Sequence, residues 1–215
     1  MPSLHAVKDT ARFGSPLSQA RGAVILVHGR GSSPHDIAGL ADVIPGAGLA
    51  FLAPAATGGT WYPQRFLAPL ERNEPWLSSA LNVVDQLVAE VLAVGIASEQ
   101  IGLAGFSQGA CLVLEYAARH PRRYGFIAGL SGALIGPPDT PRPAADLHGT
   151  PMLLGCAELD AHIPLDYVER SAEIFSRLNA DVTKQIFPGA AHAIFPAETE
   201  WLKQHAPNPG PRKAG

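Results

Sequence analysis

The stretch Gly105-Phe106-Ser107-Gln108-Gly109 reads G-x-S-x-G, and the segments on either side of it indicate how the chain folds here. The apolar run before it, residues 101–104, is typical of a short buried strand. Residues 110–120 after it are typical of a helix that ends before Pro121. Strand, sharp turn and helix in this order form the context that a nucleophile elbow requires.

The residue types within this motif have a steric and an electrostatic reason. A serine in such a turn is strained, and a Cβ two positions away would meet the neighbouring strand or helix, so glycine is expected at 105 and 109. The turn exposes the Ser107 hydroxyl above the N-terminus of the helix, which favours developing negative charge. The alternative is a glycine-rich strand-to-helix turn in which the serine has no chemical role.

Composition excludes several classes of protein. The chain has 215 residues, of which 47% are hydrophobic and 16% charged, as in a globular protein with a sizeable core. The formal net charge of −3 and the scattered Lys and Arg residues give no nucleic-acid surface. The first 20 residues lack the apolar core of a signal peptide, and no run of about 18 apolar residues is present, so we expect a cytoplasmic protein without a transmembrane segment. Cys111 and Cys156 are expected to be buried free thiols.

Strands alternate with helices along the chain. Strands are predicted at 23–27, 48–53, 101–104, 125–130, 152–156 and 182–187, and helices from 34 to 43, from 75 to 94, at 110–120, at 164–178 and around Trp201. A weak edge hairpin is expected around Val7 and Phe13. Alternation predicts an α/β fold with a mostly parallel central sheet, flanked by helices and connected by right-handed crossovers. We find no linker between two cores, so residues 1–205 are expected to form one domain and 206–215 a disordered tail.

Polar side chains follow four of these strands directly. His28, Ser107, Asp160 and His192 each come just after a separate predicted strand. Ligand sites in open parallel sheets lie beyond the carboxyl ends of the strands, so these residues are expected to converge. Ser107 is the candidate nucleophile, His192 the base that takes its proton, and Asp160 the carboxylate that orients the imidazole. The chain order Ser, Asp, His is that of α/β-hydrolases.

His162 is the main competitor for the role of base, because it follows the same strand as Asp160. Two residues are an awkward separation for a side-chain pair, which favours His192. His5, His35 and His205 lie in segments that are typical of the surface, and His120 ends a helix. No metal site is expected, since the chain has neither an HExxH motif nor paired Cys and His spacing.

Two backbone N–H groups are candidates for an oxyanion hole. One belongs to Gln108, the residue after the serine, and the other to Arg30 in the turn after the first strand, although a tight βα turn without a chemical role is the alternative there. A substrate pocket is expected from apolar residues near these positions, which in several cases could equally be packing residues. The candidates are Trp61, Tyr62, Phe66, Ile163 and Phe195.

Three segments together resemble the phospholipase/carboxylesterase family, which includes bacterial carboxylesterases and acyl-protein thioesterases. They are Val27-His28-Gly29-Arg30-Gly31, residues 101–110 and Leu130-Ser131-Gly132, and the segments around Asp160 and His192 match the acid and base motifs of the family. The resemblance implies an α/β-hydrolase fold without a large cap, no cofactor, and an acyl-enzyme reaction on carboxylic esters or thioesters. Arg30 stands where acyl-protein thioesterases usually carry leucine, which argues against a specific depalmitoylase.

The sequence therefore predicts a serine carboxylesterase that acts on small to medium acyl esters. An acyl-protein thioesterase or lysophospholipase is the nearest alternative, and a non-catalytic ligand-binding protein of the same fold comes from another class. The expected partner is a small-molecule ester, and the family resemblance permits a monomer or a homodimer.

Overall fold

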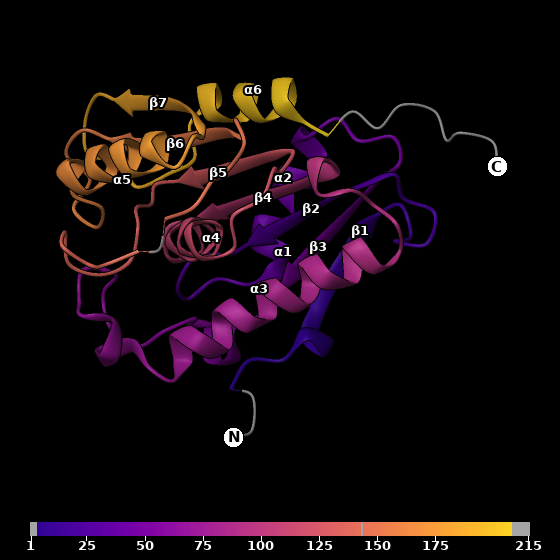
Figure 1. The fold of residues 1–215 in the computed structure, drawn as a ribbon, viewed down its shortest axis with the longest axis horizontal. Helices are drawn as coiled ribbons and strands as arrows, with labels where there is room; N and C mark the ends of the chain where they lie inside the picture. The colour runs from indigo at the N-terminus through magenta and orange to yellow at the C-terminus, as the bar shows by residue number, and fades with distance from the viewer. Residues whose placement is uncertain (1–3, 143, 208–215) are drawn as a thin grey trace.

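The computed structural model describes residues 4–142 and 144–207, which contain one mixed sheet of seven strands in the order β1-β3-β2-β4-β5-β6-β7 (Figure 1). Every neighbouring pair is parallel except β1 and β3. The strands are β1 (Thr10–Gly14), β2 (Gly22–Val27), β3 (Leu49–Pro54), β4 (Ile101–Phe106), β5 (Phe126–Leu130), β6 (Pro151–Ala157) and β7 (Asp181–Phe187). The six strands predicted from hydrophobic runs are thus confirmed.

The edge strand β1 differs from the prediction. The expected hairpin around Val7 and Phe13 is wrong, because Val7 belongs to a short 3-10 helix and β1 pairs antiparallel with β3, with Thr10 opposite Pro54. The predicted mostly parallel sheet is confirmed, with its antiparallel pair at this edge. The side chains of β1 are only partly buried, and an antiparallel edge strand tolerates water on one side, whereas parallel strands need cover on both faces.

Helices cover both faces of the sheet (Figure 1). The long helices α3 (Trp76–Ala93), α4 (Gln108–Arg119) and α5 (Leu165–Arg177) contribute to one hydrophobic cluster, while α1 (Pro34–Ile37), α2 (Gly39–Val43) and α6 (Pro196–His205) contribute to the other. The helix predicted at 34–43 is therefore two short helices. Four 3-10 helices complete the described elements, namely η1 (Val7–Asp9), η2 (Thr57–Gly59), η3 (Leu70–Asn73) and η4 (Ser98–Gln100).

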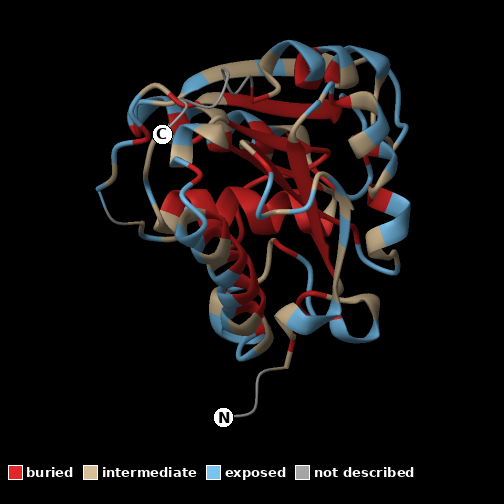
Figure 2. Cartoon of the chain, turned by 90° about the vertical axis from the view of Figure 1, so that its right-hand side faces the viewer, coloured by how far each residue is buried: buried red, intermediate tan, exposed pale blue. Residues whose placement is uncertain are grey.

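The central strand β2 shows how the sequence forms these layers. Its six residues are all buried, and they alternate between the two clusters, with Ile25 and Val27 on the side of α3 and α4, and Val24 and Leu26 on the side of α1 and α6. Figure 2 shows the central strands as buried and the outer surfaces of the helices as partly exposed. A continuous apolar run is what burial on both faces requires.

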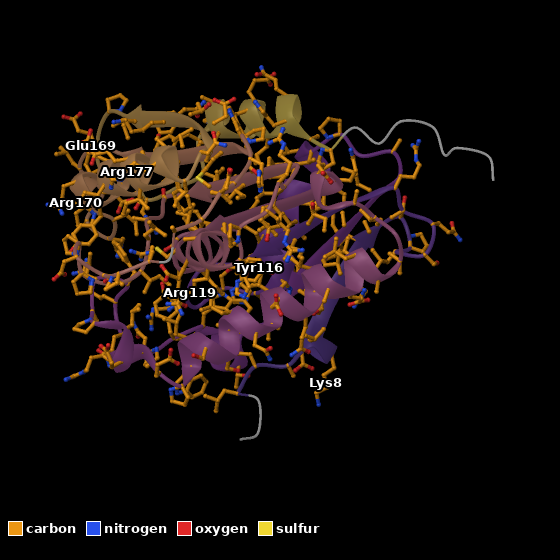
Figure 3. All side chains as sticks on the ribbon, viewed as in Figure 1. Lys8, Tyr116, Arg119, Glu169, Arg170 and Arg177 are labelled. Carbon is orange, nitrogen blue, oxygen red and sulfur yellow. The ribbon has the colours of Figure 1, made fainter. Side chains whose placement is uncertain are left out.

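A buried carboxylate attaches the long loop after β5 to helix α4. Glu115 is 1% exposed and is paired with Arg119 from its own helix, at 2.8 Å, and with Arg142 from the loop, at 2.7 Å. Figure 3 labels Arg119 on α4. The loop backbone also donates to Glu115, from Ile135 N–H at 3.2 Å. These contacts compensate the charge that burial would otherwise penalise and fix the loop.

The end of the described chain packs on the protein, since Pro207 after α6 is buried. The remainder of the predicted tail, residues 208–215, lies outside the described residues. Cys111 and Cys156 are free and buried, as expected. Among residues 4–142 and 144–207, no helix combines the length and the apolar character needed to cross a membrane.

Candidate active site

Ser107 lies in a strained turn between β4 and α4. Its backbone has φ 54° and ψ −117°, a left-handed conformation that side chains other than glycine rarely adopt. The turn is held by hydrogen bonds from Ser107 N–H to Leu130 O, at 3.0 Å, and from Cys111 N–H to Ser107 O, at 3.0 Å. A Cβ on Gly109 would overlap the Val27 carbonyl group. Close approach of the backbone therefore requires the glycine, and the turn presents the hydroxyl above the sheet.

His192 and Asp160 complete a hydrogen-bonded chain with this serine. His192 Nε2 lies 2.8 Å from Ser107 Oγ, and His192 Nδ1 lies 2.7 Å from Asp160 Oδ2. Because an ionised carboxylate only accepts hydrogen bonds, Nδ1 carries the proton and Nε2 accepts from the serine hydroxyl. In this arrangement an imidazole can take a proton from a hydroxyl while a carboxylate stabilises the charge that it gains.

The Asp160 carboxylate is held by more than the imidazole. Its other oxygen, Oδ1, accepts from the N–H groups of His162, at 2.7 Å, and Ile163, at 3.1 Å. Burial raises the pKa of this carboxyl, but the hydrogen bonds from His192 and from the two backbone N–H groups outweigh burial, so that the net pKa is lowered. Asp160 is therefore ionised at neutral pH, with both oxygens committed.

The loop that carries His192 is fixed from three sides. Leu159 N–H donates to Gly189 O at 2.9 Å, which joins the loops after β6 and β7. Ser131 Oγ donates to Ala193 O at 3.2 Å, from the loop after β5. Phe106 lies below, with its ring centroid 5.0 Å from that of His192. The side chain of His192, the candidate base, is thus positioned by neighbours from three separate strand ends.

The competing histidines have other partners. The ring of His162 lies 4.7 Å from that of His192, but it is His192 that is hydrogen-bonded to the Ser107 hydroxyl. His28 is buried, with Nδ1 2.7 Å from Gly29 O and Nε2 accepting from Ala56 N–H. His5 does not lie at the surface as expected: it is fully buried, and its Nε2 lies 2.9 Å from Trp61 O. A single sequence gives little signal for this burial, because the partners of His5 lie more than 50 residues away.

Gln108 directly follows Ser107, and Arg30 follows Gly29, where an added Cβ would lie 3.4 Å from Ser107 Cβ. Helix α4 begins at Gln108, so its first N–H groups have no acceptor within the helix. Gly31 N–H donates to Gly59 O and Ser32 N–H to Gly29 O, whereas within the described ranges no hydrogen bond uses the N–H of Arg30. The N–H groups of Arg30 and Gln108 thus stay candidates for an oxyanion hole.

The side chains of the same two residues bind the segment 61–64. Arg30 donates to three successive carbonyl oxygens, those of Tyr62, Pro63 and Gln64, at 2.9, 3.1 and 2.8 Å. Gln108 accepts from Trp61 N–H at 2.9 Å and donates to Tyr62 O at 2.8 Å. The segment is thereby attached to both candidate oxyanion residues. Sequence reasoning missed this role, because it considered only the backbone groups of Arg30 and Gln108.

A cavity of about 600 Å³ opens beside Ser107. Tyr62, Phe66 and Ile163 line it, whereas Trp61 and Phe195, also expected in a pocket, are not among its lining residues. Trp61 is fully buried and donates from Nε1 to His28 O, and Phe195 stacks on Phe187. Sequence reasoning missed several residues that line the cavity, namely Gly29, Ser32, Pro63, Gln64, Arg65, Phe106 and Cys111.

Across the part of the chain that the structure describes, no group of three or more His, Cys, Asp or Glu residues could hold a metal ion. Burial raises the pKa of the Cys111 thiol to about 12, so this cysteine at the cavity floor is protonated at neutral pH.

Comparison with known proteins agrees with this geometry. A sequence model described as phospholipase/carboxylesterase matches residues 8–207. A solved phospholipase/carboxylesterase from Dyadobacter fermentans is 39% identical, with a TM-score of 0.88, over 93% of this chain and 96% of that one. The solved esterase PE8 is 25% identical, with a TM-score of 0.71, over 91% of this chain and 96% of that one.

Curated relatives match a smaller part of the chain. An acyl-protein thioesterase 1 from Gibberella zeae is 31% identical over 117 residues, which are 53% of this chain and 50% of the relative. One from Saccharomyces cerevisiae is 29% identical over 128 residues, 58% of this chain and 56% of the relative. The chain thus spans about half the length of these curated relatives. With its family match and its fold, it belongs to the phospholipase/carboxylesterase family of α/β-hydrolases.

Proposed function

We propose that the protein is a serine carboxylesterase that cleaves small to medium acyl esters through an acyl-serine intermediate. The observation that carries the proposal is the continuous hydrogen-bonded chain from Ser107 Oγ through His192 to Asp160. These hydrogen bonds end at a cavity that is lined by Ser107, His192 and both candidate oxyanion residues. Asp160 does not line the cavity, because its side chain is fully buried.

The first half of the reaction forms the acyl-enzyme. Ser107 Oγ attacks the ester carbonyl carbon while His192 Nε2 takes the hydroxyl proton. The carbonyl oxygen becomes an oxyanion, which accepts from the N–H groups of Gln108 and Arg30, and the positive end of α4 favours this charge. When the C–O bond to the alcohol breaks, His192 gives its proton to the leaving oxygen.

The second half repeats the same steps with water. His192 takes a proton from a water molecule, the resulting hydroxide attacks the acyl carbon, and the proton returns to Ser107 Oγ as the carboxylic acid leaves. Asp160 remains ionised throughout and stabilises the imidazolium that forms in each half. No group outside the chain is consumed apart from ester and water.

A chain-length series of p-nitrophenyl esters tests this function, with Ser107→Ala beside the wild type. We expect turnover that is highest for short or medium acyl chains and is lost in the folded variant. Turnover that survives in Ser107→Ala would overturn the proposal. Absence of turnover by the folded wild type would also overturn it and would favour a thioesterase, or a ligand-binding protein if thioesters were not cleaved either.

A thioesterase on acylated proteins is the second candidate, because the curated relatives carry that name. Long-chain acyl thioesters measured beside the short esters distinguish the two. A higher kcat/KM for the long thioester would replace the proposal with this candidate. The expected cytoplasmic location and the monomeric or homodimeric state stay predictions.

A further inference from the structure

The cavity beside Ser107 carries positive charge without a lining carboxylate. Two arginines, Arg30 and Arg65, are among its lining residues, and none of the lining residues is Asp or Glu. The N-terminus of α4 adds a positive dipole end at the same place. The whole chain has a formal net charge of −3, so the cavity differs in sign from the molecule around it.

The two arginines of this cavity are held in different ways. Arg30 donates to three carbonyl oxygens of the segment 62–64, which fixes its guanidinium group. Arg65 is exposed and donates a single hydrogen bond, of 3.3 Å, to the carbonyl oxygen of His162. A guanidinium group has several N–H donors and Arg65 uses one of them, so most of its donors have no protein acceptor.

No carboxylate neutralises Arg65. The ion pairs found among residues 4–142 and 144–207 do not include it. Asp160 is the carboxylate of the site, but its side chain has no exposed area and both of its oxygens are committed to His192 and to backbone N–H groups. The Arg65 guanidinium is therefore open to an anionic group of a bound molecule.

We propose that the preferred esters of this site carry an anionic group, a carboxylate or a phosphate, which Arg65 binds at the mouth of the cavity. The inference rests on the proposed esterase function and specifies its substrate class. A planar guanidinium matches the two oxygens of a carboxylate or phosphate with two parallel hydrogen bonds. Arg65 lies in the loop 60–66, and its hydrogen bond to His162 O reaches the loop after β6. Both residues line the cavity, so the guanidinium group lies at its mouth between these two loops.

Matched pairs of esters test this proposal. The first pair is 4-carboxyphenyl butyrate and its neutral amide, 4-carbamoylphenyl butyrate, with 4-phosphonooxyphenyl butyrate as the phosphate arm. The second pair places the charge on the acyl side, as the mono-4-nitrophenyl ester of adipic acid and its methyl ester. For each pair, kcat/KM is measured in the wild type and in Arg65→Gln, so that intrinsic ester reactivity cancels in the double ratio.

We expect Arg65→Gln to lower kcat/KM about tenfold for the charged member of at least one pair and less than twofold for its neutral partner. Arg65→Lys keeps the charge without the fork and should retain part of the preference. Arg72→Gln removes an equal charge from the same long loop outside the cavity lining, and should leave both members unchanged. The phosphate arm shows which anion is preferred.

An equal effect of Arg65→Gln on charged and neutral members of every pair would overturn the proposal. Failure of the esterase function is distinguishable, since the wild type would then hydrolyse none of the neutral esters. In that case calorimetry with 4-hydroxybenzoate and 4-hydroxybenzamide gives the same comparison without turnover. Equal binding of the two by the wild type would overturn the anion site.

Discussion

His192 Nε2 lies 2.8 Å from Ser107 Oγ, although the two residues are 85 positions apart in the chain. The contact exists because β4 and β7 run parallel in one sheet, with β5 and β6 between them, so that their carboxyl ends lie on the same side. A hydroxyl and an imidazole at this distance can exchange a proton directly. Asp160 holds the imidazole in place, and the turn that contains Gly109 holds the serine.

Asp160→Asn should fold like the wild type and lose about 10³- to 10⁴-fold in kcat, because an amide no longer fixes the proton of His192 on Nδ1 and cannot stabilise an imidazolium. Steady-state hydrolysis of p-nitrophenyl butyrate measures the loss, and circular dichroism monitors folding. Asp146→Asn is the control, since Asp146 also accepts from a backbone N–H, that of His148, on the surface. Wild-type kcat in Asp160→Asn would assign the acid role to another residue.

Arg30→Met should lower kcat about tenfold and change KM less than threefold. The variant keeps the backbone N–H but loses three hydrogen bonds to the segment 62–64, so the oxyanion donor is less well positioned. The free energy of unfolding should fall by about 1–2 kcal/mol, since the side chain is partly in water. Affinity for a boronic acid that mimics the oxyanion should fall in parallel with kcat.

Arg72→Met is the control for this variant, because Arg72 is exposed in the same loop and does not line the cavity. A lowered melting temperature with unchanged kcat and boronic acid affinity would show that Arg30 acts only on stability. That result would remove its positioning role.

Glu198→Gln should alter how stability depends on pH. Burial raises the pKa of the Glu198 carboxyl from 4.5 to about 7, although the hydrogen bond from Phe195 N–H opposes the shift. Between these pH values the folded protein keeps a proton that the unfolded chain has lost, so the wild type loses stability as pH rises. The variant does not titrate there, and its stability relative to wild type should increase by about 2–3 kcal/mol from pH 4.5 to pH 7.

Urea denaturation at half-unit steps from pH 4.5 to pH 8 measures this difference. Glu173→Gln, at an exposed position of α5, should show no such trend. A stability difference between Glu198→Gln and the wild type that stays constant across the range would mean that Glu198 is ionised in the folded protein.

Gly109→Ala should destabilise the protein by about 3 kcal/mol or prevent folding, because the added Cβ would overlap the carbonyl groups of Val27 and His28. Gly39→Ala is the matched control, since Gly39 lies in α2 with no atom within 4 Å of an added Cβ. Alanine there should be neutral or slightly stabilising. Thermal unfolding distinguishes the two, and equal melting temperatures would contradict the steric account of the turn.

Much of the fold could be predicted because its signal is local. The buried strands are continuous apolar runs, as in β2, and the position of Ser107 follows from a motif with a strand before it and a helix after it. Asp160 and His192 could be named because each directly follows a strand. Parallel strands bring their carboxyl ends together, so order along the chain is enough to place them at one edge.

The remainder depends on contacts that leave no periodic pattern. The antiparallel pairing of β1 depends on which edge is free, and a five-residue, half-exposed strand carries little information about that. Trp61 and Phe195 are aromatic residues near the site, but they pack on His28 and Phe187 and do not line the cavity beside Ser107. The burial of Glu198 against Gly155 could not be predicted from the sequence either, because a Glu at the third position of a helix is ordinarily a solvated capping residue.

Rapid mixing with p-nitrophenyl butyrate, followed by acid quenching and peptide mass spectrometry, tests the central claim most directly. We predict an initial burst of p-nitrophenol that approaches one equivalent per chain, together with one butyryl group on Ser107. Ser107→Ala should show neither. A butyryl group on another residue, or steady turnover by a folded Ser107→Ala protein, would contradict the acyl-serine mechanism.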